Sequence, residues 1–149
     1  DVVETKGPGG YAMVKTLKAK KDKVPALVGT TLAEVKKAAA GLKLKIIGAA
    51  FLSVIDNKDG VITFQTGYAV SRKLKNLVGF DIIDLPAGKV AQVEFTGSYA
   101  DTYPGYNAII KWLNDNKKEG TGDPMEFYLS DPKSVSPPNQ KIKIIYPIK

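Results

Sequence analysis

The sequence predicts an α+β fold in which a β-β-α-β-β unit occurs twice. Strand and helix patterns follow one another in the same order in both halves, and clusters of glycine and proline separate them. A chain of 149 residues, 44% of them hydrophobic and 25% charged, has the size and composition of one soluble globular domain. We therefore expect a single domain over residues 1–149, with pseudo-repeat halves at about 1–72 and 79–149.

The two halves are expected to form their sheet together. Two strands and a helix alone bury too little apolar surface to be stable. We predict one curved antiparallel sheet with pseudo-twofold symmetry and both helices on one face, which leaves the other face free to be concave. An α+β domain with two helices and no internal duplication is the alternative.

The first half begins with a pair of strands and continues into a helix. Val2–Lys6 and Tyr11–Leu17 have strand patterns, and Gly7–Gly10 between them predicts a turn that pairs them. The helix is expected from about Pro25 to Leu42, with a capping box at Thr31–Glu34. Its apolar residues recur at helical spacing: Leu32, Val35, Ala39 and Leu42.

A β-hairpin follows this helix. Ile46–Ile55 and Val61–Ser71 have strand composition, and Asp56–Gly60 between them predicts the connecting turn. The turn resembles part of a calcium loop, but the ligand spacing and the terminal glutamate are missing. We therefore expect no metal there.

The second half repeats this order. Phe80–Leu85 and Lys89–Thr96 are expected to pair through a turn at Pro86–Gly88, and a helix is expected from about Tyr103 to Lys117. The apolar stripe of this helix consists of Tyr106, Ile109, Ile110 and Leu113. Trp112 lies beside the stripe, and we interpret it as a residue that packs the helix on the sheet.

The closing hairpin carries the carboxylate of most functional interest. Met125–Ser130 and Lys141–Ile148 are its expected strands, joined by a loop in which Asp131-Pro132 predicts a turn. Because strand side chains alternate between faces, Glu126 and Tyr128 share one face. The other face carries Met125, Phe127 and Leu129. If that apolar face packs on a helix, Glu126 and Tyr128 lie side by side on the opposite surface.

Composition excludes several classes of catalytic and metal site. The chain has no His and no Cys, so Ser-His and Cys-His catalysis, zinc sites with His or Cys ligands and disulfides are impossible within it. Any acid–base chemistry must use carboxylates, Tyr or Lys. We expect no metal and no cofactor.

The net charge of +7 comes from 22 basic and 15 acidic residues, and Arg72 is the only arginine. Recognition of bases and phosphates favours Arg, whereas Lys is mostly a solvated surface charge. We therefore expect no direct binding of nucleic acid by this chain, and an anionic membrane surface stays an alternative partner.

The sequence also bears on location. No apolar run approaches the roughly 20 residues that cross a bilayer, so we expect no transmembrane segment in the given chain. Because it begins at Asp1 rather than Met, we expect a mature form or an excised domain of a longer or anchored protein. A cytoplasmic location is favoured, and the oligomeric state is open.

The second half resembles a known family over Phe80–Lys149. The resemblance rests on an ordered set of segments: Leu85–Ala91, Gly97–Tyr99, Tyr106 with Trp112, Gly122 with Glu126-x-Tyr128-x-x-Asp131-Pro132, and Ile142–Ile148. These segments are similar to the GyrI-like small-molecule-binding domain, which also serves as the effector-binding module of AraC-type and MerR-type transcription activators. The first half matches only in the order of its elements. No helix-turn-helix pattern lies ahead of the domain, so the chain as given is not expected to be a DNA-binding regulator.

The resemblance implies a duplicated β-β-α-β-β fold with a ligand pocket between the two halves. In multidrug-sensing members a buried glutamate pairs there with cationic aromatic ligands, and Glu126 is the matching position. Some stand-alone members are implied to hydrolyse cyclopropane-bearing electrophiles with a pocket carboxylate and aromatic partners. Glu126 would then be the catalytic acid–base group, with Tyr128 or Tyr146 orienting it.

Five aromatic residues are further candidates for the ligand site. Tyr128 and Tyr146, on adjacent strands, are expected either to border the cavity or to fill the core with their hydroxyls at the surface. Phe64 and Tyr68 share a face of the matching strand in the first half and would form the opposite wall. Tyr99 lies in the connection from strand to helix, where family pockets are lined.

We predict a bacterial small-molecule-binding domain that senses or sequesters an aromatic, cationic or hydrophobic ligand. A hydrolase acting on strained electrophiles through Glu126 is the first alternative, and a non-enzymatic protein-interaction domain is the second. In an interaction domain Glu126 would be an exposed carboxylate, whereas the other two functions need it buried in an aromatic pocket.

Overall fold

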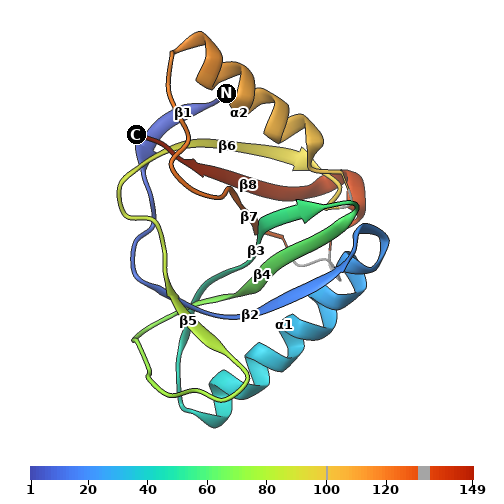
Figure 1. Cartoon of the computed structure of the whole chain (residues 1–149), viewed down its shortest axis with the longest axis vertical. Coiled ribbons are helices and arrows are strands. Elements are labelled where there is room, and N and C mark those ends of the chain that lie inside the picture. The colour runs from blue at the N-terminus through green and yellow to red at the C-terminus, as the bar shows by residue number, and fades with distance from the viewer. Residues whose placement is uncertain (100, 131–134) are drawn as a thin grey trace. The chain divides into compact units, whose positions relative to one another are not determined.

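The computed structural model describes residues 1–99, 101–130 and 135–149, which form two compact units. Unit 1 combines Asp1–Pro8 with Pro86–Lys149, and unit 2 is the continuous segment Gly9–Leu85. Each unit has one α-helix and a set of antiparallel strands (Figure 1), so the predicted α+β class and the repeated β-β-α-β-β order are confirmed. None of the helices in the described part of the chain is long and apolar enough to span a bilayer.

Unit 2 is a sheet with strand order β3-β4-β2-β5 and a helix packed on one face. Its strands are β2 (Tyr11–Lys20), β3 (Ile46–Lys58), β4 (Val61–Val70) and β5 (Asp81–Asp84), and the short 3-10 helix η1 (Lys21–Lys23) leads into α1 (Val24–Gly41). Met13 and Val70 of the sheet pack with Ala39 of α1 in one buried cluster. Lys15 Nζ also forms an ion pair with Glu34 of α1 at 2.6 Å. These contacts identify the face of the sheet that α1 covers.

Unit 1 has the strand order β1-β6-β8-β7. Its elements are β1 (Val3–Lys6), β6 (Lys89–Gly97), α2 (Tyr103–Asp115), β7 (Met125–Tyr128), the 3-10 helix η2 (Pro137–Asn139) and β8 (Gln140–Pro147). Val93 of β6 and Ile144 of β8 share a buried cluster with Ile109 of α2. Trp112 is half-buried against the same cluster, as predicted. The predicted turn at Asp131-Pro132 lies outside the described residues.

The first strand of each predicted half pairs with a strand of the other half. β1 pairs with β6 rather than with β2, and β5 pairs with β2 rather than with β6. The backbone N–H of Gly7 donates to Gly88 O, and that of Leu85 donates to Gly10 O, both at 2.8 Å. The two hairpins predicted around these glycines are therefore wrong. A turn signal shows where the chain changes direction but does not identify the strand that it meets next.

The β3–β4 hairpin closes through a tighter turn than predicted. Asp59 and Gly60 have φ values of 53° and 81°, the left-handed conformation that a two-residue hairpin turn requires. Asp56–Lys58, expected in the turn, instead continue β3 after a bulge that follows Val54. The Asp-Gly pair is sufficient to reverse the chain.

Helix α1 begins well ahead of the predicted capping box, so Thr31 lies buried inside the helix. Pro25 occupies the first turn, where its missing N–H leaves no helical hydrogen bond unmade. Val35 and Ala39 are buried as predicted, but Leu42 lies past the helix end and is 41% exposed.

Helix α2 buries a stripe that is rotated from the predicted one. Ile109 and Leu113 are buried as expected, whereas Ile110 is 51% exposed. Gly105 takes the buried position one turn earlier, where a Cβ would lie 2.3 Å from the ring of Phe95. The missing side chain therefore allows α2 to approach the sheet closely.

Candidate functional site

The candidate site lies on β7, beside the first turn of α2. Glu126 and Tyr128 stand opposite Ile144 and Ile142 of β8 in the antiparallel register. Both isoleucines belong to the buried cluster that contains Ile109 of α2. Because residues opposite one another in an antiparallel pair share a face, Glu126 and Tyr128 point toward the face that α2 covers.

This placement corrects the expectation that Glu126 lies on the sheet face away from a helix. The alternation itself holds, since Glu126 and Tyr128 share a face. However, Met125 is 4% and Phe127 is 6% exposed, so both faces of β7 are buried. The apolar character of Met125 and Phe127 therefore did not show which face of β7 the helix covers.

Glu126 is a buried carboxylate held by hydroxyl groups. It is 5% exposed, and the hydroxyls of Thr102 and Tyr128 donate hydrogen bonds to it. Burial raises the pKa of Glu126 above its ordinary value of 4.5, and the two hydrogen bonds oppose part of that rise because they stabilise the ionised form. Within the residues that the structure describes, no Lys or Arg forms an ion pair with Glu126.

Thr102 is a polar partner of Glu126 that sequence reasoning missed. It occupies the N-cap position of α2, yet its hydroxyl makes no cap hydrogen bond to the helix. Its carbonyl accepts the first helical bond, from the N–H of Gly105 at 3.1 Å. A threonine just ahead of Tyr103-Pro104 fits a helix start, but no sequence signal links it to a glutamate on a later strand.

Two phenols flank the carboxylate. Tyr128 lies beside it on β7, and Tyr106 lies on α2; both are half-buried. Burial raises the pKa of both phenols, and the negative charge of Glu126 adds to the rise. Both hydroxyls therefore stay protonated near neutral pH. Sequence reasoning placed Tyr106 only in the apolar stripe of the helix.

Tyr99 completes the aromatic group through Tyr128. The two ring centroids are 4.7 Å apart with an interplanar angle of 49°, which is a tilted aromatic contact. The Tyr99 hydroxyl donates to the carbonyl of Ser130 and accepts the N–H of the same residue at 2.8 Å. Its own backbone N–H donates to Gln140 Oε1 at 3.0 Å. Tyr99 is thus fixed from three directions.

The other three predicted aromatic residues are on β8 and β4. Tyr146 is on the α2 face of β8, but its ring packs over Gly120, where a Cβ would lie 2.2 Å from a ring carbon. Phe64 and Tyr68 lie on β4 of unit 2; Phe64 is fully buried, and Tyr68 packs against the cluster under α1. Burial raises the pKa of Tyr68. The role of these two residues as an opposite pocket wall stays a prediction.

Comparison with known proteins identifies the family of this chain. Residues 12–149 match the family model of the GyrI-like small molecule binding domain. The chain belongs to the GyrI-like family. The predicted family and the small-molecule class of partner are thereby confirmed. None of the curated proteins compared with the chain matched it at a significant level.

Solved structures share the GyrI-like fold at low sequence identity. The crystal structure of the EcmrR C-terminal domain matches with a TM-score of 0.81 and 20% identity, over 100% of this chain and 97% of that one. EcmrR in a cryo-EM complex with DNA matches with a TM-score of 0.85 and 20% identity, and this chain spans 57% of its length. An uncharacterized conserved protein from Listeria innocua matches with a TM-score of 0.72 and 12% identity, over 100% of this chain and 92% of that one.

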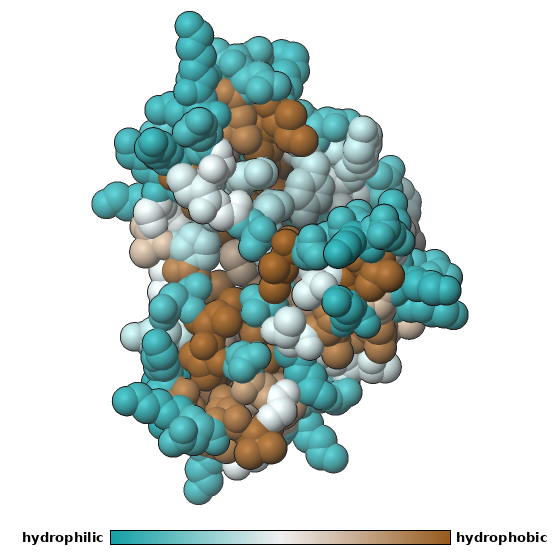
Figure 2. Space-filling view, viewed as in Figure 1, coloured by the Kyte–Doolittle hydropathy of each residue, from teal (hydrophilic) through white to brown (hydrophobic). Residues whose placement is uncertain are grey.

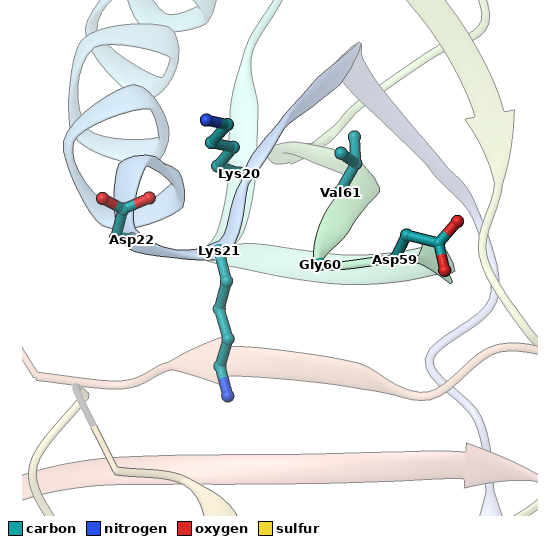
Figure 3. Close-up of a pocket in the computed structure, with 6 residues that line it drawn as sticks. All are labelled: Lys20, Lys21, Asp22, Asp59, Gly60 and Val61. Carbon is teal, nitrogen blue, oxygen red and sulfur yellow. The ribbon is translucent and has the colours of Figure 1, made fainter.

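A surface depression in unit 2 of this GyrI-like domain is a weaker candidate site. It is open and shallow and is lined by Lys20, Lys21, Asp22, Asp59, Gly60 and Val61. Figure 3 shows the carboxylates of Asp22 and Asp59 at opposite ends of the depression, pointing away from each other. Across the described residues no group of three or more acidic side chains could hold a metal ion. The depression therefore lacks converging ligands.

Glu126, Thr102, Tyr106 and Tyr128 form a group that allows two kinds of chemistry. An ionised, buried carboxylate among phenol rings attracts a cation, because the rings add cation–π attraction to the charge. A carboxyl group whose pKa burial raises also holds its proton more readily, which suits a general acid.

Proposed function

We propose that this GyrI-like domain binds a lipophilic organic cation and that Glu126 is its counter-charge. The observation that carries the proposal is the 5% exposure of Glu126 with no basic partner among the described residues. Keeping a carboxylate ionised without a partner is costly in a low-dielectric site. A cationic ligand at the carboxylate would remove that cost, whereas a neutral ligand would not.

The surrounding rings favour a cation with apolar substituents over a hydrated ion. Tyr106 and Tyr128 lie beside the carboxylate, and Tyr99 contacts the ring of Tyr128. The faces of such rings attract organic cations more strongly when water is excluded. The carboxylate oxygens are engaged by Thr102 and Tyr128. A carboxylate has about four acceptor sites, so these two bonds leave its charge available to a cation.

A neighbour in fold supports this ligand class. SAV2435 was solved bound to tetraphenylphosphonium and matches this chain with a TM-score of 0.65 and 10% identity, over 100% of this chain and 94% of that one. The fold thus accommodates an organic cation with four aryl groups in at least one protein.

The proposal is tested with two ions of the same shape and opposite charge. Calorimetric titration would compare tetraphenylphosphonium with tetraphenylborate on the wild type, Glu126→Gln and the surface control Glu94→Gln. We expect the cation to bind the wild type and the Glu94→Gln variant equally, and Glu126→Gln to bind it on the order of 100-fold more weakly. Equal binding of both ions, or of the cation to all three proteins, would contradict the proposal.

Hydrolysis through Glu126 is the second candidate function. It is favoured by the raised pKa of Glu126, which suits a general acid, and by the phenol of Tyr128 that could orient it. A hydrolase from Listeria innocua has a related fold, with a TM-score of 0.67 and 9% identity. Turnover of a cyclopropane-bearing electrophile that is lost in Glu126→Gln would favour this function, and unchanged turnover would exclude it. An interaction domain with an exposed Glu126 does not fit the buried position of this residue.

A further inference from the structure

We infer that one end of unit 2 binds peripherally to the surface of an anionic lipid bilayer. This surface, the basic end, consists of Leu42–Ile47, which connects α1 to β3 and includes the first two residues of β3, and of Ser71–Gly79, which follows β4. The two segments lie side by side, because the backbone N–H of Ser71 donates to Lys45 O at 3.0 Å.

Positive charge is concentrated in unit 2 and is unopposed at this end. Gly9–Leu85 holds 13 basic and 6 acidic residues, a net charge of +7, whereas the residues of unit 1 hold nine of each and are neutral. The basic end has five basic residues and no acidic one: Lys43, Lys45, Arg72, Lys73 and Lys75. Lys73 pairs with Asp84 of β5 at 3.8 Å. The other four form no ion pair within the part of the chain that the structure describes.

Exposed aliphatic side chains lie among these charges. Val78 is 93% exposed, Ile47 is 58% exposed and Leu42 is 41% exposed. Other aliphatic residues of the same segments pack in the core of unit 2: Leu44, Ile46, Leu74 and Leu77. The exposed side chains thus project from a backbone that the core anchors. Figure 2 shows apolar surface around β5 and the segment before it, with hydrophilic side chains at its margin.

The surface of an anionic bilayer can interact with both the positive charges and the exposed aliphatic side chains of the basic end. Lysines near an anionic bilayer are attracted to its head groups, and short aliphatic side chains enter the boundary between head groups and acyl chains. Nucleic acid is the less suitable partner, because its surface is recognised mainly by Arg and by stacking aromatic rings. The basic end has one Arg and no aromatic residue.

The opposite end of unit 2 provides an internal control. Lys18 and Lys20 are exposed there as well, and Lys20 lines the shallow depression together with Asp22 and Asp59. Removing two positive charges at either end changes the net charge of the chain equally. If the two double variants differ in lipid binding, the difference is therefore due to the local surface and not to the overall charge.

The test is sedimentation of the whole chain with vesicles of phosphatidylcholine, with and without phosphatidylserine. We expect binding only to vesicles that contain phosphatidylserine. Arg72→Gln with Lys75→Gln should weaken it by roughly 25-fold, about fivefold per charge, and Val78→Ser should weaken it without a change in charge. Lys18→Gln with Lys20→Gln should weaken it far less. All of these positions are exposed, so each variant should retain the wild-type unfolding midpoint.

Three results would overturn the inference. The first is no binding to phosphatidylserine vesicles. The second is an equal loss in the two double variants, which would indicate nonspecific attraction. The third is binding of duplex DNA that depends on Arg72 and Lys75 as strongly as lipid binding does, which would make nucleic acid the partner.

Discussion

The hydroxyl of Thr102 donates a hydrogen bond to Glu126 and accepts none from the amides of the helix that it begins. An N-cap threonine ordinarily accepts a bond from an amide of the first helical turn. Here the hydroxyl connects the start of α2 to the carboxylate of β7. The ionisation of the carboxylate and the start of the helix are therefore coupled through this bond.

Removing this hydroxyl should make Glu126 a weaker acid. Thr102→Val keeps the shape of the side chain but deletes the donor, so the ionised carboxylate loses a stabilising bond and the pKa of Glu126 should rise further. Thr102→Ser keeps the donor and should leave the pKa close to the wild-type value. Carbon-detected NMR titration of the Glu126 carboxyl measures both. A pKa that is the same in the Val and Ser variants would show that Thr102 does not hold the carboxylate.

Glu126 should also make folding stability depend on pH. Burial holds its folded-state pKa above 4.5, so the unfolded chain ionises first as pH rises. Below about 4.5 the carboxyl is protonated in both states, and its contribution to stability is fully present. That contribution is lost as pH rises from there through the folded-state pKa. The free energy of unfolding of the wild type should therefore fall relative to Glu126→Gln over this window.

Urea unfolding at a series of pH values measures that difference. Glu94→Gln, at an exposed position of β6, serves as the control and should run parallel to the wild type. A constant difference between wild type and Glu126→Gln across the window would refute the assignment of Glu126 as a buried carboxyl with a raised pKa.

Gly105→Ala should destabilise unit 1 through overpacking. The added methyl would lie 2.3 Å from the Phe95 ring and 2.7 Å from Ile144 Cδ1, and we expect a loss of about 1–3 kcal/mol. The matched control is Gly29→Ala in α1, where a Cβ meets open space. That change should stabilise the chain by about 0.5–1 kcal/mol because alanine favours the helix. Denaturant unfolding of both variants gives the comparison, and equal effects would contradict the close packing of α2.

Tyr99→Phe should loosen the strand end beside the site. The hydroxyl of Tyr99 bonds to both backbone groups of Ser130, and its loss should cost about 1–3 kcal/mol while the ring contact with Tyr128 remains. Hydrogen exchange at the Ser130 amide should accelerate, whereas Tyr103→Phe, at a side chain that is 69% exposed, should have little effect. An unchanged exchange rate at Ser130 would show that the hydroxyl is not a structural anchor.

Local patterns predicted the elements well because they depend on neighbouring residues. Alternation placed Glu126 and Tyr128 on one face, and helical periodicity found α1 and α2. Pairing between distant segments was not predictable in this way. The exchange of β1 and β5 depends on backbone contacts such as that between Gly7 and Gly88, which leave no local signature.

The site was only partly predictable for the same reason. Glu126, Tyr128 and Tyr99 were candidates because of strand composition and the family resemblance. Thr102 and Tyr106 join them only because the start of α2 comes to lie beside β7. Tyr146 lies on the strand next to that of Tyr128, as predicted, and its ring packs over Gly120, a contact that strand composition does not specify.

The claim that Glu126 is the counter-charge of a bound cation is tested most directly by the affinity for tetraphenylphosphonium as a function of pH. The Glu126 pKa, determined independently by NMR, gives the expected position of the transition. We predict that wild-type affinity falls as pH drops through that pKa, while the weak affinity of Glu126→Gln stays constant over the same range. A wild-type affinity that is independent of pH, or a Glu126→Gln profile with the same transition, would contradict the account.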